Sequence, residues 1–145
     1  MYQHILIATD GSDLAGKAVS QGLALAKALN AKVTALNAIE PWTSTMLGEG
    51  VAFNFPIEEY ETAAVNASES ILAKVSEQAA ASGVQCQTLH VSDFPADAIV
   101  QTAKDKGCDL IVMASHGRRG LARVLLGSQA IQVLTHTTVP VLVCR

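Results

Sequence analysis

Five short apolar runs alternate along the chain with longer stretches in which apolar residues recur every three or four positions. The short runs have the length of strands, and the periodic stretches have the spacing of helices. We expect strands at Ile5–Ala8, Lys32–Ile39, Val84–Val91, Leu110–Met113 and Val139–Cys144. We expect helices at Leu14–Leu29, from Pro56 to Ser82, from Asp93 and Pro95 to Gly107, and after Ser128.

This alternation predicts an α/β fold in which residues 1–145 form a single domain. The sheet would be open, five-stranded and parallel, with helices on both faces. The first and fourth strands are the most uniformly apolar and suit the centre, whereas Gln85, Gln87 and His90 make the third strand suitable for an edge. The predicted strand order is 3-2-1-4-5. It reverses between the first and fourth strands, and ligands bind at such points.

Composition and charge narrow the classes of function. The chain is 50% hydrophobic with a net charge of -3, which disfavours nucleic-acid binding by counterion release. No stretch approaches ~18 consecutive apolar residues, and the start of the chain lacks a signal-peptide pattern, so we expect a cytoplasmic protein without membrane contact. The cysteines Cys86, Cys108 and Cys144 have no CxxC spacing and are expected to be buried, reduced thiols.

The stretch from Ala114 to Ser128 connects the fourth strand to the last helix and is rich in glycine and arginine. Its glycines are Gly117, Gly120 and Gly127, and it holds three of the four arginines of the chain, Arg118, Arg119 and Arg123. Glycines allow close backbone approach, helix N-termini attract anions, and guanidinium groups bind phosphate. The pattern favours a phosphate-binding loop; the alternative is a solvated surface loop without a ligand.

Three smaller features leave alternatives open. Asp10 ends the first strand, where it could accept hydrogen bonds from ribose, hold hydrated magnesium, or cap the first helix together with Ser12. His116 could contact phosphate or brace its turn. The spacing GxxxxGK that ends at Lys17 resembles a P-loop but lacks the Ser or Thr that a P-loop needs, so Lys17 is interpreted as a solvated helix residue.

The segment from Pro41 to Pro56 is long for a loop and unusually apolar. It contains Trp42, the only tryptophan, and two of the three phenylalanines of the chain. Loops of this length are often lids or contact surfaces. The apolar side chains could pack onto the core of the domain, or cover a ligand cleft or a partner subunit.

Four pieces in this order resemble the universal stress protein family over the whole chain: ATDGS, NAIEP, DLIVMASHGRRGLARVLLGS and VPVLVCR. In the nucleotide-binding branch of that family, the loop follows the pattern G-x2-G-x9-G-(S/T). Gly117, nine intervening residues and Gly127-Ser128 match this pattern, whereas Ala114 replaces the first glycine. A methyl group at Ala114 is either tolerated or weakens nucleotide binding.

The resemblance implies a role for individual residues in a Rossmann-like fold. Gly117, Gly127 and Ser128 would hold phosphates through backbone N–H groups and the serine hydroxyl. Thr9 and Asp10 would lie beside the ribose and adenine, the backbone of Ala38 would meet the adenine edge, and Met113 would pack near the base. The complete expected set is Ala8, Thr9, Asp10, Ala38, Met113, Ala114, His116, Gly117, Arg118, Arg119, Gly127, Ser128 and Gln129.

The same resemblance implies a cytoplasmic homodimer joined through the last strand, Val139 to Cys144. It would bind ATP, ADP or AMP, with or without Mg²⁺, and nucleotide occupancy would change a surface that an unknown protein partner reads. The sequence shows no catalytic constellation and no metal-ligand spacing among its histidines. Two alternatives remain open: a slow ATPase or related phosphohydrolase that uses Asp10, and a dimeric scaffold that binds no nucleotide.

Overall fold

The structure is a computed structural model that describes residues 1–41, 56–117 and 126–145. Within these residues, five strands form one sheet in which all neighbours are parallel. The strands are β1 (His4–Ala8), β2 (Lys32–Ile39), β3 (Cys86–Ser92), β4 (Leu110–Ala114) and β5 (Val141–Cys144). Their order across the sheet is β3-β2-β1-β4-β5, which confirms the predicted fold class and strand order.

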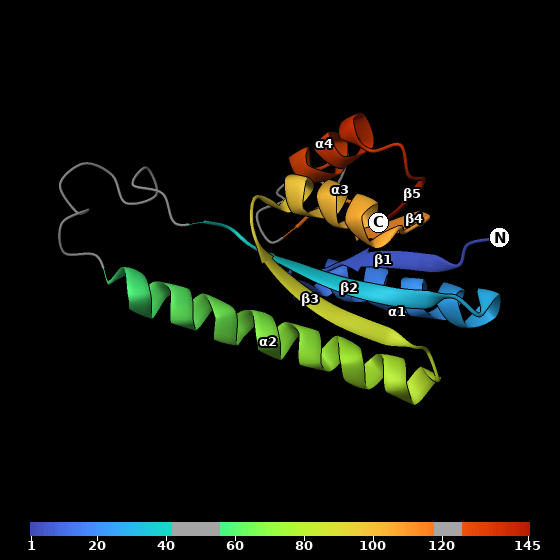
Figure 1. The fold of residues 1–145 in the computed structure, drawn as a ribbon, viewed down its shortest axis with the longest axis horizontal. Coiled ribbons are helices and arrows are strands. Elements are labelled where there is room, and N and C mark those ends of the chain that lie inside the picture. The colour runs from blue at the N-terminus through green and yellow to red at the C-terminus, as the bar shows by residue number, and fades with distance from the viewer. Residues whose placement is uncertain (42–55, 118–125) are drawn as a thin grey trace.

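Helices cover both faces of this sheet. They are α1 (Asp13–Leu29), α2 (Ile57–Ser82), α3 (Pro95–Lys106) and α4 (Ser128–His136). Helices α1 and α2 lie on one side of the sheet, and α3 and α4 lie on the other (Figure 1). The N-terminal part of α2 extends past the end of the sheet. The predicted contact loop, Pro41 to Pro56, falls outside the described residues from 42 to 55.

Three helices end at a residue with a left-handed backbone, and this ending shifts the start of one strand. The φ angles of Asn30, Gly83 and Gly107 are 55°, 72° and 67°. After each, the chain folds back onto the last helical turn, as the Val84 N–H does by donating to the Ala79 carbonyl at 2.9 Å. The Val84 N–H is therefore engaged by the last turn of α2, and β3 begins at Cys86 instead of the predicted Val84.

The last strand also begins later than predicted, at Val141 instead of Val139. The Val139 N–H donates to the side-chain Oγ1 of Thr137 at 3.0 Å, and Pro140 has no N–H to give to a ladder. The Pro140 carbonyl accepts the Ile111 N–H at 2.9 Å, and regular pairing with β4 starts only after it.

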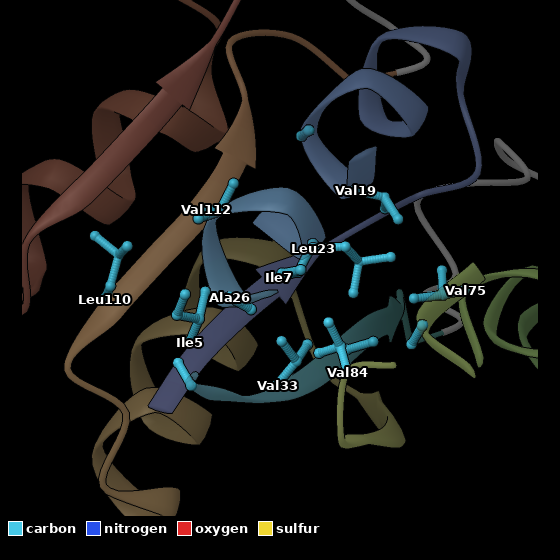
Figure 2. Close-up of a cluster of buried hydrophobic side chains, with 14 of the residues drawn as sticks. Ile5, Ile7, Val19, Leu23, Ala26, Val33, Val75, Val84, Leu110 and Val112 are labelled. Carbon is cyan, nitrogen blue, oxygen red and sulfur yellow. The ribbon is translucent and has the colours of Figure 1, made fainter. Parts of the chain in front are cut away.

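Alternate residues of each strand point to opposite faces and build two separate cores. Ile5, Ile7 and Val33 pack beneath α1 and α2 (Figure 2), whereas Leu6 and Leu36 pack beneath α3 and α4. Because both faces are covered, the central strands must be continuous apolar runs, which is the pattern that the sequence shows.

The three cysteines are free thiols, as predicted. Cys108 and Cys144 are buried, whereas Cys86 on the edge strand is half-buried. Burial raises the pKa of Cys108 to about 11. The thiol of Cys108 is therefore protonated at neutral pH and serves as a small apolar group of the core.

Candidate functional site

The turn after β1 holds the first group of predicted site residues. The Thr9 N–H donates to the Leu36 carbonyl at 3.0 Å, and the Thr9 Oγ1 accepts the Gly11 N–H at 3.2 Å. The Asp10 Oδ1 accepts the Ser12 N–H at 2.9 Å. Gly11 has a φ of 79°, a conformation that favours glycine. These bonds fix the carboxylate of Asp10 at the carboxyl end of β1.

Helix α1 follows this turn without an intervening loop. It begins at Asp13, one residue before the predicted Leu14, and the Ser12 side chain caps it by accepting the Ala15 N–H at 3.2 Å. The spacing GxxxxGK therefore lies largely within a helix, and Lys17 is exposed on its surface. This placement agrees with the interpretation of Lys17 as a solvated residue and leaves no P-loop at this position.

The end of β4 provides the second wall of the site. The Ser115 carbonyl accepts the Gly127 N–H at 2.8 Å, so the start of α4 is bonded directly to the end of β4. The Ser115 Oγ lies 3.0 Å from the Nδ1 of His116. Of the two roles left open for His116, the structure shows this bracing contact.

Gln129 connects α4 to α3. Helix α3 starts with Phe94 as N-cap and Pro95 at its first position, and no side chain of its own caps it. The Gln129 Oε1 accepts the Ala96 N–H at 3.0 Å and so supplies a cap from another helix. The side chain that the sequence placed among the ligand contacts thus also holds two helices together.

A cavity of about 430 Å³ opens between these segments, at the carboxyl ends of β1 and β4. Of the thirteen predicted site residues, Arg118 and Arg119 lie outside the described residues, as do Gly120 and Arg123 of the same loop. The other eleven line the cavity: Ala8, Thr9, Asp10, Ala38, Met113, Ala114, His116, Gly117, Gly127, Ser128 and Gln129. Four segments far apart in the sequence therefore meet where the strand order reverses.

Two glycines lie where the two walls approach each other closely. A Cβ at Gly117 would come within 2.8 Å of the Asp10 Oδ2, and a Cβ at Gly127 would come within 2.7 Å of the Ser115 carbonyl oxygen. Ala114 differs from these glycines, because its side chain packs against the core beneath α1 and α2. The methyl group at the position of the first motif glycine therefore has a place on the side of the sheet away from α3 and α4.

Sequence reasoning missed several residues that line the cavity, Asn37 and Ser115 among them. Asn37 is 6% exposed, and its Nδ2 donates to the Thr9 carbonyl at 2.8 Å. The signal for it was present, because a single amide interrupts an otherwise apolar strand near its carboxyl end. Sequence reasoning also missed Glu40, which adds a carboxylate just after β2. The other lining residues are apolar: Ala15, Leu36, Pro95, Ile99 and Ala130.

A second polar cluster lies at the opposite end of the sheet. The Asp109 carboxylate accepts the N–H groups of Gln3 and His4 at 2.9 Å and 3.0 Å, and the His4 Nε2 lies 2.7 Å from the Thr34 Oγ1. Burial, with the charge of Lys32, lowers the pKa of His4. Burial alone would raise the pKa of Asp109, but the N–H groups of Gln3, His4 and Asp109 itself, together with the charge of His4, outweigh burial and lower that pKa.

The part of the chain that the structure describes offers neither a metal site nor a membrane-spanning helix. No three His, Cys, Asp or Glu side chains gather there in an arrangement that could hold a metal ion. None of the helices among the same residues is long and apolar enough to span a membrane.

A doubly wound parallel sheet with a cavity at its switch point is the arrangement in which open α/β sheets bind their ligands. The chain belongs to the universal stress protein family, whose model matches residues 1–145. A universal stress protein of Bacillus subtilis, YxiE, is 34% identical over 100% of both chains.

Solved structures agree with this assignment. The universal stress protein UspA of Lactobacillus plantarum is 25% identical with a TM-score of 0.83, over 99% of this chain and 98% of that one. A universal stress protein in complex with cAMP is 30% identical with a TM-score of 0.74, over 99% of this chain and 97% of that one. Sheet order and helix placement are thus those of solved members of the family.

Proposed function

We propose that the protein binds an adenine nucleotide in the cavity at the ends of β1 and β4 and acts as a nucleotide-dependent regulatory module in the stress response. The observation that carries this proposal is the convergence of eleven predicted residues on one cavity of about 430 Å³. That volume lies in the range of about 300–1,000 Å³ that small-molecule sites occupy. The related structure in complex with cAMP supports the class of ligand.

The walls of the cavity suggest how the nucleotide would lie. Asp10 would accept hydrogen bonds from the ribose, and the backbone of Ala38 would meet the adenine edge beside Met113. The Gly127 N–H already donates to Ser115, so we assign the phosphate contacts to Gly117, to Ser128 and to the first N–H groups of α4. Mg²⁺ would depend mainly on phosphate oxygens, with Asp10 as a carboxylate within the cavity.

Occupancy of this cavity could be transmitted through the contact between α4 and α3. Gln129 lines the cavity and also caps α3, so a ligand that moves α4 would move the start of α3. Phe94, the N-cap of α3, is 48% exposed and offers an apolar contact to a protein partner at that point. This coupling supports a signalling role, and the cytoplasm as its place belongs to the same proposal.

A homodimer through β5 belongs to the same proposal. β5 is an edge strand of the sheet, and Leu142 on it is 39% exposed. An apolar edge strand invites pairing with another strand. Leu142→Lys should convert the dimer to a monomer in analytical ultracentrifugation, and a monomeric wild-type protein would contradict this part of the proposal.

The binding proposal is tested on the purified protein. Heat denaturation should release a nucleotide, and calorimetry with ATP, ADP, AMP and cAMP should identify which of them binds. Asp10→Ala should lower the affinity for the nucleotide by about tenfold or more because a charged hydrogen-bond acceptor is lost. Asp13→Ala is the matched control, since Asp13 is exposed and not among the residues that line the cavity.

Two results would change the proposal. If no nucleotide is released and none binds, the protein is a scaffold and the proposal fails. Multiple-turnover phosphate release from ATP that is lost in Asp10→Ala would show hydrolysis instead of regulated binding.

A further inference from the structure

We infer that Asn37 is a positioning residue that keeps the backbone of Ala38 open for the base of the nucleotide; this inference rests on the function proposed above. Asn37 on β2 is 6% exposed and lies between Leu36 and Ala38, which also line the cavity. Its Nδ2 donates to the carbonyl of Thr9 at 2.8 Å. The bond joins the end of β2 to the turn that carries Asp10.

The register of β1 and β2 shows what this bond replaces. Backbone groups of successive strand residues point to alternate sides, and the Leu36 carbonyl accepts the Thr9 N–H while the Ile39 carbonyl accepts the Asp93 N–H beyond β3. Even-numbered residues at the end of β2 therefore face β1. The N–H of Ala38 lies on that side, and in a continued parallel ladder it would donate to the carbonyl of Thr9.

The side chain of Asn37 donates to the Thr9 carbonyl instead. The pairing of β1 with β2 stops at Ala8 and Leu36, and within the described residues no backbone bond joins Ala38 to Thr9. The ladder thus ends one bond early, and the Thr9 carbonyl is nevertheless satisfied, as a buried carbonyl must be. The Ala38 N–H is left at the rim of a cavity that Ala38 itself lines.

The consequence concerns the kind of base that the cavity accepts. A backbone N–H donor suits the acceptor nitrogen N1 of adenine, which lies next to the N6 amino donor. A guanine held in the same position would turn its own N1–H donor toward the Ala38 N–H, so that two donors would face each other. Asn37 would therefore favour adenine without touching it, because it prevents the sheet from using the donor that the base requires.

A purely structural role for Asn37 makes a different prediction. If the side chain only satisfied the Thr9 carbonyl, its loss would destabilise the turn and weaken all nucleotides by a similar factor. If it keeps Ala38 open, its loss lets the Ala38 N–H close onto Thr9, and adenine nucleotides alone lose their partner. The ratio of ATP to GTP affinity separates the two, because that ratio does not depend on the folded fraction.

The test uses the full chain with Asn37→Leu, which keeps the approximate size of the side chain, and Asn37→Ala as a second variant. Calorimetry should show that ATP affinity falls about tenfold while GTP affinity stays within about twofold of its wild-type value. Asn66→Leu is the matched control at an exposed position of α2 and should leave both affinities unchanged. An equal loss for ATP and GTP in both Asn37 variants would overturn the inference.

Amide exchange by NMR tests the backbone step without any nucleotide. The Ala38 amide should exchange quickly in the wild-type protein and become protected in Asn37→Leu, because it then joins the ladder. Protection of Ala38 already in the wild type would overturn the inference even if ATP binds. If Ala38 behaves as expected but the wild type binds no nucleotide, the proposed function fails while the arrangement of the strand ends holds.

Discussion

The two ends of the sheet contain similar polar residues and use them in opposite ways. At the amino ends of the strands, Asp109 accepts the N–H groups of Gln3 and His4, and His4 lies against Thr34. These groups satisfy one another. At the carboxyl ends, Asp10 accepts the Ser12 N–H and also lines a cavity of about 430 Å³.

The difference follows from the connections at each end. Each helix returns to the sheet through a short link at the amino ends, and three of these links start from a left-handed residue that turns the chain immediately. At the carboxyl ends, β2 and β4 lead into long segments before α2 and α4, whereas β1 and β3 reach α1 and α3 within four and two residues. Short links bring polar groups close enough to pair with one another. The cavity lies at the ends of β1 and β4, where the strand order reverses, so the topology and not the length of the links alone decides which end can bind.

The largest expected effect comes from adding one methyl group at the junction of β4 and α4, beside the cavity. In Gly127→Ala, the new Cβ would lie 2.7 Å from the Ser115 carbonyl oxygen, which is backbone and cannot turn away. The start of α4 must then move from the end of β4. We expect a loss of about 2 kcal/mol in the free energy of unfolding and at least tenfold in nucleotide affinity, measured by urea denaturation and calorimetry.

Gly16→Ala is the control for this glycine substitution, because nothing lies within 4 Å of a Cβ at that position in α1. It should raise the free energy of unfolding by up to about 1 kcal/mol and leave nucleotide affinity unchanged. If Gly127→Ala binds nucleotide as the wild type does, the junction of β4 and α4 does not shape the site.

The opposite end should respond in stability alone. Asp109→Ala removes the acceptor for two backbone N–H groups, and we expect the free energy of unfolding to fall by about 2 kcal/mol in urea titrations. Nucleotide affinity should not change. Asp105→Ala removes an exposed carboxylate that accepts only the Gln101 side chain, at 2.7 Å, and should cost less than about 0.5 kcal/mol. A matching loss of nucleotide affinity in Asp109→Ala would show that the two ends are coupled.

Sequence patterns predicted the topology because a parallel sheet covered on both faces needs continuous apolar strands. The errors lay at two strand starts, Val84 and Val139, where the side chains are apolar but the backbone is already engaged. Val84 donates to the last turn of α2, and Val139 donates to Thr137. Hydropathy records which side chains are apolar, and it does not record where a backbone N–H is used.

Eleven of the predicted site residues line one cavity for a different reason. Turn residues and glycines at strand ends carry local chemistry, and the predicted strand order reverses between the first and fourth strands, which brings the ends of β1 and β4 together. Contacts between distant segments were not predictable, such as Gln129 with Ala96 or Asn37 with Thr9. An amide can serve a ligand or a neighbouring backbone equally well, and only the positions of the surrounding groups decide between them.

A buried hydroxyl on α2 contrasts with both ends, since it has neither partner nor cavity. Ser68 is 1% exposed, and its Oγ is the one buried side-chain N or O in the described residues without a hydrogen bond. Ser68→Ala should raise the free energy of unfolding by about 1 kcal/mol, because an unsatisfied polar group is removed. Ser70→Ala, exposed on the same helix, should gain only the difference in helix propensity, at most about 0.5 kcal/mol. If Ser68→Ala and Ser70→Ala raise the stability by the same amount in thermal and urea unfolding, the Ser68 hydroxyl has a hydrogen-bond partner in solution.

The smallest expected effect is a dependence of stability on pH that arises at the amino end. Burial and the charge of Lys32 lower the pKa of His4 below its ordinary value of 6.5, so the unfolded chain binds a proton more readily than the folded one. The contribution of His4 to stability is therefore complete above pH 6.5 and decreases as the pH falls from there toward the pKa of the folded state. Urea titrations at pH 7.5 and 5.5 measure how much the free energy of unfolding falls between these two pH values. This fall should be smaller in His4→Gln than in the wild type. The control is His90→Gln, an exchange at an exposed position, which should show the same fall as the wild type because His4 is still present. If the free energy of unfolding falls equally in all three proteins, the pairing of His4 with Thr34 does not exclude the charged imidazole. Water then reaches the amino ends of the strands more easily than the hydrogen bonds there indicate.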